Sequence, residues 1–169
     1  MKVTVVAGNP KAGSRTLDAA HRVATAVTGS PAEHTVDVIT LGAGLLGWGD
    51  DAVAAAVHTV QTSDLVVVAS PTFKATYTGV LKLFLDQFAT GEGLRDVVVV
   101  PLMLGAGPAH AMAPDLFLKH VLVELGATAP APGLYLLDST YTTDTAIADY
   151  AARWGSALTA AATARTELS

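Results

Sequence analysis

A loop rich in glycine and hydroxyl side chains follows the first apolar segment of the chain. Its sequence is Gly8-Asn9-Pro10-Lys11-Ala12-Gly13-Ser14-Arg15-Thr16. The preceding run Val3–Ala7 is typical of a buried strand, and a helix is expected over Ser14–Val27. Backbone N–H groups at the start of such a helix favour an anion, and Arg15 offers a guanidinium that suits phosphate oxygens. The loop therefore predicts a phosphate site; the alternative is a plain turn with Ser14 as the N-cap.

Two better-known nucleotide motifs fit this loop poorly. Gly8 and Gly13 have the spacing of a nucleotide-hydrolase P-loop, but Ser14-Arg15 stands where Lys followed by Ser or Thr is required. The apolar run Leu65–Ala69 also lacks the terminal aspartate that would hold magnesium. A G-x-G-x-x-G dinucleotide fingerprint is absent from this turn. The phosphate of a mononucleotide is favoured over ATP.

Two further loops of small and polar residues follow the third and fourth strand candidates. In Ser70–Thr78, the backbone amides of Thr72 and Phe73 are expected to meet the polar edge of a flat ring, which Phe73 would partly cover. Packing of Phe73 in the core or a subunit interface is the alternative. In Leu104–His110, the glycines let the backbone approach a planar ligand closely. His110 is expected to hydrogen-bond that ligand; the alternatives are that it caps a helix or is exposed to solvent.

Strand-like and helix-like segments alternate along the chain, which indicates one α/β domain over residues 1–169. We expect a flavodoxin-like three-layer sandwich, with a five-stranded parallel sheet of order 2-1-3-4-5 flanked by helices. Ligands in such sheets bind outside the carboxyl ends of the strands. The expected strands are Val3–Ala7, His34–Leu41, Leu65–Ala69, Val97–Leu104 and Gly133–Leu137, and the expected helices are Ser14–Val27, Asp51–Thr62, Thr78–Phe88, Ala109–Leu125 and Thr143–Thr166.

The composition narrows the classes of partner and location. The chain has 169 residues, a formal net charge of −5 and no cysteine. Because no basic run occurs, a nucleic-acid partner is not expected. The absence of cysteine excludes disulfides and thiolate metal sites, and the histidines form no metal-spaced cluster, so no metal is expected. The apolar N-terminal stretch is too short for a signal peptide or a membrane span, and a cytoplasmic location is expected.

The three loops together resemble those of the NAD(P)H-dependent FMN reductases. The resemblance lies in Gly8-Asn9-Pro10, Ser14-Arg15-Thr16 and the segment Ser70–Lys82, and the Gly105–His110 loop with Ala113–Lys119 is most similar to the alkanesulfonate-type reductases of two-component monooxygenase systems. The resemblance implies FMN and NAD(P)H as cofactors. It implies that the FMN phosphate is bound by Ser14, Arg15 and Thr16, in a loop that also includes Asn9 and Lys11. It implies that the isoalloxazine lies along Pro71, Thr72, Phe73 and Lys74. The other side of the isoalloxazine would be bordered by Gly105, Ala106, Gly107 and His110.

The same resemblance implies an enzyme that transfers hydride from the nicotinamide to FMN. The flavin carries the chemistry, so no catalytic side chain is expected. Reduced FMN would supply a partner flavin-dependent monooxygenase; the alternatives are a quinone, azo or metal-ion reductase that retains FMN, and a non-enzymatic electron carrier. A homodimer or homotetramer is also implied. Leu116 and Phe117 stand near the place where some two-component members have an inserted tyrosine associated with flavin exchange.

Overall fold

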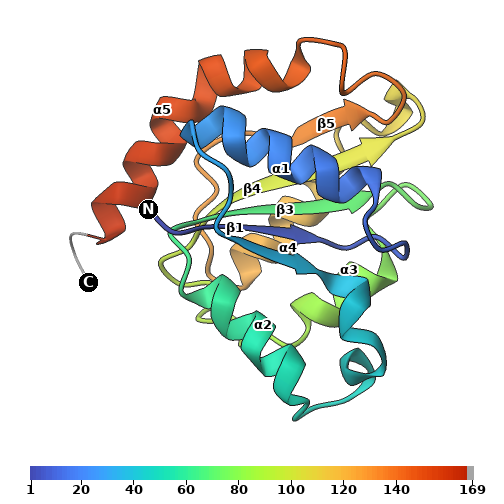
Figure 1. The fold of residues 1–169 in the computed structure, drawn as a ribbon, viewed down its shortest axis with the longest axis vertical. Helices are drawn as coiled ribbons and strands as arrows, with labels where there is room; N and C mark the ends of the chain where they lie inside the picture. The colour runs from blue at the N-terminus through green and yellow to red at the C-terminus, as the bar shows by residue number, and fades with distance from the viewer. Residues whose placement is uncertain (167–169) are drawn as a thin grey trace.

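The computed structural model describes residues 1–166 and contains one five-stranded parallel sheet (Figure 1). The strand order is β2-β1-β3-β4-β5, which confirms the expected flavodoxin-like topology. Every residue of the three central strands is buried, as their continuous apolar runs predict. The strands are β1 (Val3–Ala7), β2 (His34–Asp37), β3 (Leu65–Pro71), β4 (Val98–Gly105) and β5 (Leu134–Leu137).

Helices cover both faces of the sheet and create two apolar cores. Helices α1 (Arg15–Thr28) and α5 (Ala146–Thr166) lie side by side on one face (Figure 1). The other face packs against α2 (Asp51–Gln61), α3 (Gly79–Leu85) and α4 (Lys119–Glu124). Because β1, β3 and β4 contribute side chains to both cores, the loops at the carboxyl edge are attached to a rigid base.

Strand β2 is shorter than the sequence predicts. The strand was expected to extend to Leu41, but it ends at Asp37 and a 3₁₀ segment covers Val38–Leu46. Strand β2 is an edge strand that pairs only with β1, and its last pair joins Asp37 to Ala7, where β1 ends. With no partner beyond that point, the chain turns away from the sheet.

The helix expected over Ala109–Leu125 is broken into three pieces. A 3₁₀ turn spans Pro108–His110, a π-helical turn spans Pro114–Leu118, and only Lys119–Glu124 is α-helical. Pro114 lies at the start of the π-helical turn, where its missing N–H is tolerated, and it separates that turn from the 3₁₀ turn before it. The prediction of one long helix was therefore wrong, although Gly126 follows its end with the positive φ of 96° that glycine allows.

The remaining helices match the expected elements with shifted ends. Asp50 caps α2 by accepting the amides of Ala52 and Val53, and Thr78 caps α3 by accepting the amide of Leu81. In residues 1–166, no helix is long and apolar enough to cross a membrane.

Candidate functional site

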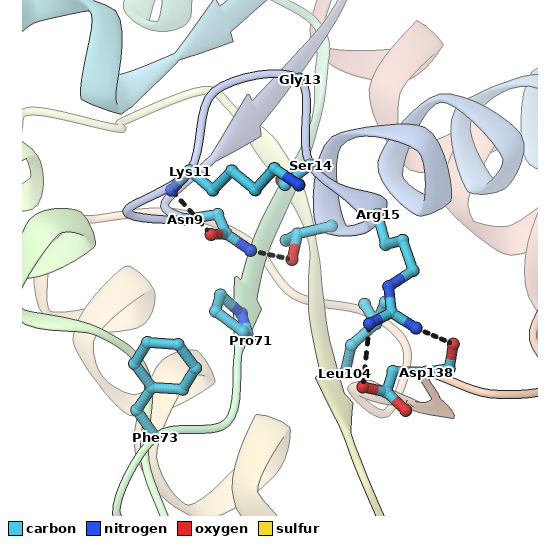
Figure 2. Close-up of a pocket in the computed structure, with 10 residues that line it drawn as sticks. Asn9, Lys11, Gly13, Ser14, Arg15, Pro71, Phe73, Leu104 and Asp138 are labelled. Atoms are coloured by element: carbon cyan, nitrogen blue, oxygen red, sulfur yellow. Dashed lines mark hydrogen bonds and ion pairs between the residues drawn. The ribbon is translucent and has the colours of Figure 1, made fainter.

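A cavity of about 320 Å³ opens at the carboxyl edge of the sheet, where β1, β3, β4 and β5 end (Figure 2). The sheet order places β1 beside β3, so the loops that leave these two strands meet at this edge. The lining residues are Asn9, Lys11, Gly13, Ser14, Arg15, Thr16, Pro71, Phe73, Leu104 and Asp138.

The loop after β1 is held by its own side chains in a form that presents donors to the cavity. Ser14 is the N-cap of α1 and accepts the amide of Leu17 at 3.3 Å. Asn9 donates to the Thr16 hydroxyl at 2.9 Å, which ties the start of the loop to the first turn of the helix (Figure 2). The amides of Arg15 and Thr16 belong to the first turn, which an α-helix does not pair internally. The Ser14 hydroxyl accepts the Leu17 amide and still has its own proton to donate. Ser14 can therefore cap the helix and bind an anion at the same time.

Two carboxylates approach the same loop from the strands at either side. Gly13, with a φ of 60°, donates its amide to Asp37 Oδ2 at 2.9 Å. The Arg15 guanidinium donates from Nη1 to the backbone oxygen of Asp138 at 3.1 Å, and its Nη2 lies 3.8 Å from Asp138 Oδ2 (Figure 2). The ends of β2 and β5 therefore both take part in shaping the loop.

The start of helix α3 holds the loop after β1 in place. The buried Thr78 hydroxyl donates to the carbonyl of Gly8 at 2.6 Å, and the Thr78 amide donates to Ser70 Oγ at 3.0 Å. A Cβ at Gly8 would lie 2.3 Å from the Cβ of Leu81, so only glycine allows the strand end to pass the helix this closely. The loops after β1 and β3 thus share one support.

The loop after β3 forms a tight two-residue hairpin rather than a row of free amides. Thr72 donates its amide to Leu104 at 2.6 Å, and Phe73 and Thr76 exchange amide-to-carbonyl bonds at 2.8 and 3.2 Å. The prediction that the Thr72 and Phe73 amides face a ring is therefore wrong, because the β3–β4 ladder and the hairpin use them. Lys74 and Ala75 form the turn with φ of 53° and 68°. Such values are unusual for residues with a Cβ and place strain at this edge.

A second cavity, of about 510 Å³, adjoins the first beyond this hairpin. The two share a border, because Pro71 and Phe73 line the first and Thr72 lines the second. Thr72 Oγ1 is buried without a hydrogen-bond partner among the described residues, which makes it a candidate contact for a ligand. The remaining lining residues form one loop: Gly105, Ala106, Gly107, Pro108, Ala109 and His110.

Tyr135 on β5 positions the loop that borders the second cavity. Its hydroxyl donates to the carbonyl of Gly107 at 2.7 Å. A Cβ at Gly105 would lie 1.9 Å from that hydroxyl oxygen, so glycine is needed where the loop passes the tyrosine. The exposed His110 lies at the far end of this loop, in a 3₁₀ turn.

Tyr141 attaches the segment after β5 to helix α1. The hydroxyl of the buried Tyr141 donates to Asp18 Oδ2 at 2.9 Å, and Arg22 Nε donates to the same oxygen at 2.7 Å. Burial raises the pKa of Asp18, but the hydrogen bonds from Arg22 and Tyr141 outweigh burial and leave that pKa below its usual range. Burial, and then the bond to Asp18, raises the pKa of Tyr141. This contact fixes the chain a few residues beyond Asp138.

The structure brings together twelve of the thirteen residues that the sequence singles out. Those of the first loop line the first cavity with Pro71 and Phe73, while Thr72 and the Gly105–His110 loop line the second. Lys74 lines neither cavity and lies at the tip of the hairpin. Of the residues that line these two cavities, Asp138 alone lies outside the three loops that the sequence singles out, and its position directly after the fifth strand was the signal that could have found it. Within residues 1–166 no cluster of side chains suits a metal ion.

Comparison with protein families gives a match over most of the chain. The model of the family described as NADPH-dependent FMN reductase matches residues 1–142. An FMN reductase (NADPH) of Escherichia coli strain K12 is 40% identical over 80 residues, which are 47% of this chain and 41% of that protein. The chain thus aligns with less than half the length of this relative. The NADH-dependent FMN reductase SfnF of Pseudomonas putida is 30% identical over 143 residues, covering 80% of this chain and 76% of that protein.

Solved structures give the same fold over nearly the whole chain. The apo form of the NADH:FMN oxidoreductase EmoB superposes with a TM-score of 0.80 and 27% identity, covering 96% of this chain and 89% of that one. An oxidoreductase from Corynebacterium diphtheriae superposes with a TM-score of 0.79, covering 99% and 98% of the two chains; at 23% identity this likeness concerns the fold.

Proposed function

Because this chain belongs to the NADPH-dependent FMN reductase family, we propose that it transfers hydride from NAD(P)H to FMN at the carboxyl edge of its sheet. The observation that carries the proposal is the pair of adjoining cavities, one lined by cations and hydroxyls and the other by a glycine loop. Bound FMN would supply the two-electron chemistry, accepting hydride from the nicotinamide. The chain's own residues would bind the flavin and orient it.

The residues of the first cavity fit the phosphate of FMN. Ser14, Arg15 and Thr16 combine hydroxyls, a guanidinium and the first-turn amides, and Lys11 adds a second cation. Asn9 holds Thr16 in place through the bond described above. These donors lie at the start of a helix of 14 residues, whose dipole also favours an anion.

The residues around the second cavity fit a flat ring. The unpartnered Thr72 hydroxyl gains a hydrogen-bond partner if the polar edge of the ring reaches it. Pro71 and the half-exposed Phe73 offer apolar surface to the ring, and Lys74 provides a nearby cation. The opposite wall of the cavity is the loop that contains Gly105, Ala106, Gly107 and His110. No side chain here needs to act as an acid or base, because hydride transfer requires position rather than proton transfer.

Reduced FMN would leave this open site and supply a flavin-dependent monooxygenase, as the resemblance to the alkanesulfonate-type reductases suggests. We also propose a cytoplasmic location, because the reaction uses the nicotinamide dinucleotides present inside the cell. We also propose a homodimer or homotetramer. Large apolar side chains are exposed on α3 and on the broken segment before and within α4: Leu83, Met112, Leu116, Phe117 and Val123. Such side chains are typical of subunit contacts, and sedimentation of the purified protein measures the state directly.

The test is a flavin titration of the purified protein combined with an oxidation assay. A colourless protein that oxidises NAD(P)H only when FMN is added supports an FMN reductase that exchanges its flavin. A yellow protein that keeps FMN through purification points instead to a reductase of another acceptor. A protein that binds no FMN contradicts the proposal.

The variant Arg15→Ala tests the phosphate end of the site. We expect FMN to bind about 10- to 100-fold more weakly, because charge-assisted hydrogen bonds to a phosphate are lost, while riboflavin binding stays the same. Arg95→Ala is the matched control, since Arg95 pairs with Glu92 near the amino edge of the sheet. Equal losses for FMN and riboflavin would refute the phosphate role.

A further inference from the structure

The cavity that we assign to the phosphate holds a carboxylate as well as cations. Of the charged residues that line it, Lys11 and Arg15 are basic and Asp138 is acidic. A phosphate monoester carries nearly two negative charges at neutral pH. The two cations alone would match that charge, whereas the lining with Asp138 has a single net positive charge.

The Asp138 carboxylate is not what holds Arg15 in place. The hydrogen bond from Arg15 Nη1 goes to the backbone oxygen of Asp138, and it does not require the side chain. The carboxylate lies at 3.8 Å from Nη2, too far for a hydrogen bond, and both side chains reach solvent, with 67% and 35% exposed. Ion pairs of this kind contribute little to stability. The carboxylate therefore adds a negative charge to the cavity without a structural need for it.

Asp37, the other carboxylate near the loop, has a different role. Its Oδ2 accepts the Gly13 amide at 2.9 Å, its Oδ1 is buried, and it does not line this cavity. Removing its charge would disturb the fold of the loop. Asp138 is thus the carboxylate whose charge acts on a ligand rather than on the loop.

Building on the proposed function, we propose that Asp138 is a specificity-determining residue that weakens the binding of the FMN phosphate and so keeps the flavin exchangeable. Its carboxylate competes with the phosphate for Arg15 and repels the dianion across the cavity. The chain would then bind FMN only moderately more tightly than riboflavin, although it has a phosphate loop with two cations.

The test is Asp138→Asn, which keeps the size and the backbone contact and removes the charge. Titrations followed by the quenching of flavin fluorescence measure the affinity for FMN and for riboflavin. We expect the variant to bind FMN about 5- to 10-fold more tightly, with slower dissociation, and riboflavin within about twofold of the wild type. Asp138→Ser is the second variant and should give the same direction.

Glu33→Gln is the control for net charge, because Glu33 is exposed before β2 at the amino edge of the sheet. It should leave both affinities unchanged, and an equal gain there would overturn the proposal by showing an effect of overall charge. Weaker or unchanged FMN binding in both Asp138 variants would also overturn it, and weaker binding would show that the carboxylate positions Arg15. Failure of the wild type itself to bind FMN would instead refute the proposed function.

Discussion

The two ends of the candidate site are built in different ways. At the phosphate end, side chains hold the loop: Asn9 binds Thr16, Asp37 binds Gly13, and Thr78 binds the carbonyl of Gly8. At the ring end, the hairpin at Phe73–Thr76 is held by its own backbone and carries two residues at positive φ. Side-chain hydrogen bonds therefore tie the phosphate loop to the fold, whereas the hairpin at the ring end is strained and exposed.

This contrast indicates that the two ends of the site have different roles in ligand binding. A rigid phosphate end positions a ligand before the ring is in place, which lowers the entropic cost of binding. The exposed hairpin at the ring end leaves room for a second planar molecule. If the contrast is correct, changes at the phosphate end reduce the stability of the whole fold, while changes at the ring end cost little.

The largest effect is expected for Gly8→Ala. The new Cβ would lie 2.3 Å from Leu81 Cβ and 2.9 Å from Leu81 Cα, so helix α3 itself has to shift. We expect a loss of about 3 kcal/mol in the free energy of unfolding, which lowers the melting temperature by roughly 6–12 °C. Thermal unfolding followed by circular dichroism measures this shift.

Gly79→Ala is the matched control for that prediction. Gly79 begins α3, and a Cβ there meets nothing within 4 Å. The control should be as stable as the wild type or slightly more stable, because alanine favours a helix. Equal melting temperatures for Gly8→Ala and the wild type would show that the phosphate end is not coupled to α3.

A smaller loss is expected for Tyr141→Phe, which removes the hydroxyl bound to Asp18. The cost at neutral pH is about 1 kcal/mol, the usual value for one hydrogen bond. The pKa of Tyr141 is raised in the folded protein. The hydroxyl therefore contributes to folding stability below pH about 10, and this contribution is lost as the pH rises through the raised pKa. The pKa of Asp18 is lowered, so its contribution is present above pH about 4 and is lost as the pH falls through the lowered value.

Urea unfolding at several pH values measures this difference. The gap in stability between the wild type and Tyr141→Phe should be widest near neutral pH and narrow toward both extremes. The acid side will narrow only slightly, because solvent screens the half-exposed Asp18. Tyr77→Phe removes a phenol with no hydrogen bond among the described residues and should show no such gap. A gap that is independent of pH would mean that packing, not the hydrogen bond, stabilises this segment.

The sequence predicted the buried strands and their order because continuous apolar runs and short loops leave few arrangements. It predicted the phosphate loop for the same reason, since Gly8–Thr16 follows a strand and begins a helix. It could also have revealed the broken segment before α4, because Pro114 cannot continue a helix. The end of β2 was harder to foresee, since it depends on where its only partner, β1, stops.

Two features of the site required the three-dimensional structure. The contact between Arg15 and Asp138 joins residues 123 positions apart, through the placement of α1 beside the end of β5. The hairpin at Lys74-Ala75 lacks the glycine or asparagine that normally marks such a turn. Both belong to the surroundings of the cavity, where tertiary packing overrides local preference.

The smallest effect, and one of opposite sign, is expected for Ala75→Gly at the ring end. Ala75 has a φ of 68°, which is unfavourable for a residue with a Cβ and free for glycine. Relief of this strain outweighs the greater entropy of the unfolded chain, so the variant should gain about 0.5 kcal/mol. Ala12→Gly is the matched control, because Ala12 lies exposed in the phosphate loop without a positive φ and should lose stability. Equal losses in both variants would mean that the hairpin carries no strain, and the two ends of the site would then differ only in their side chains.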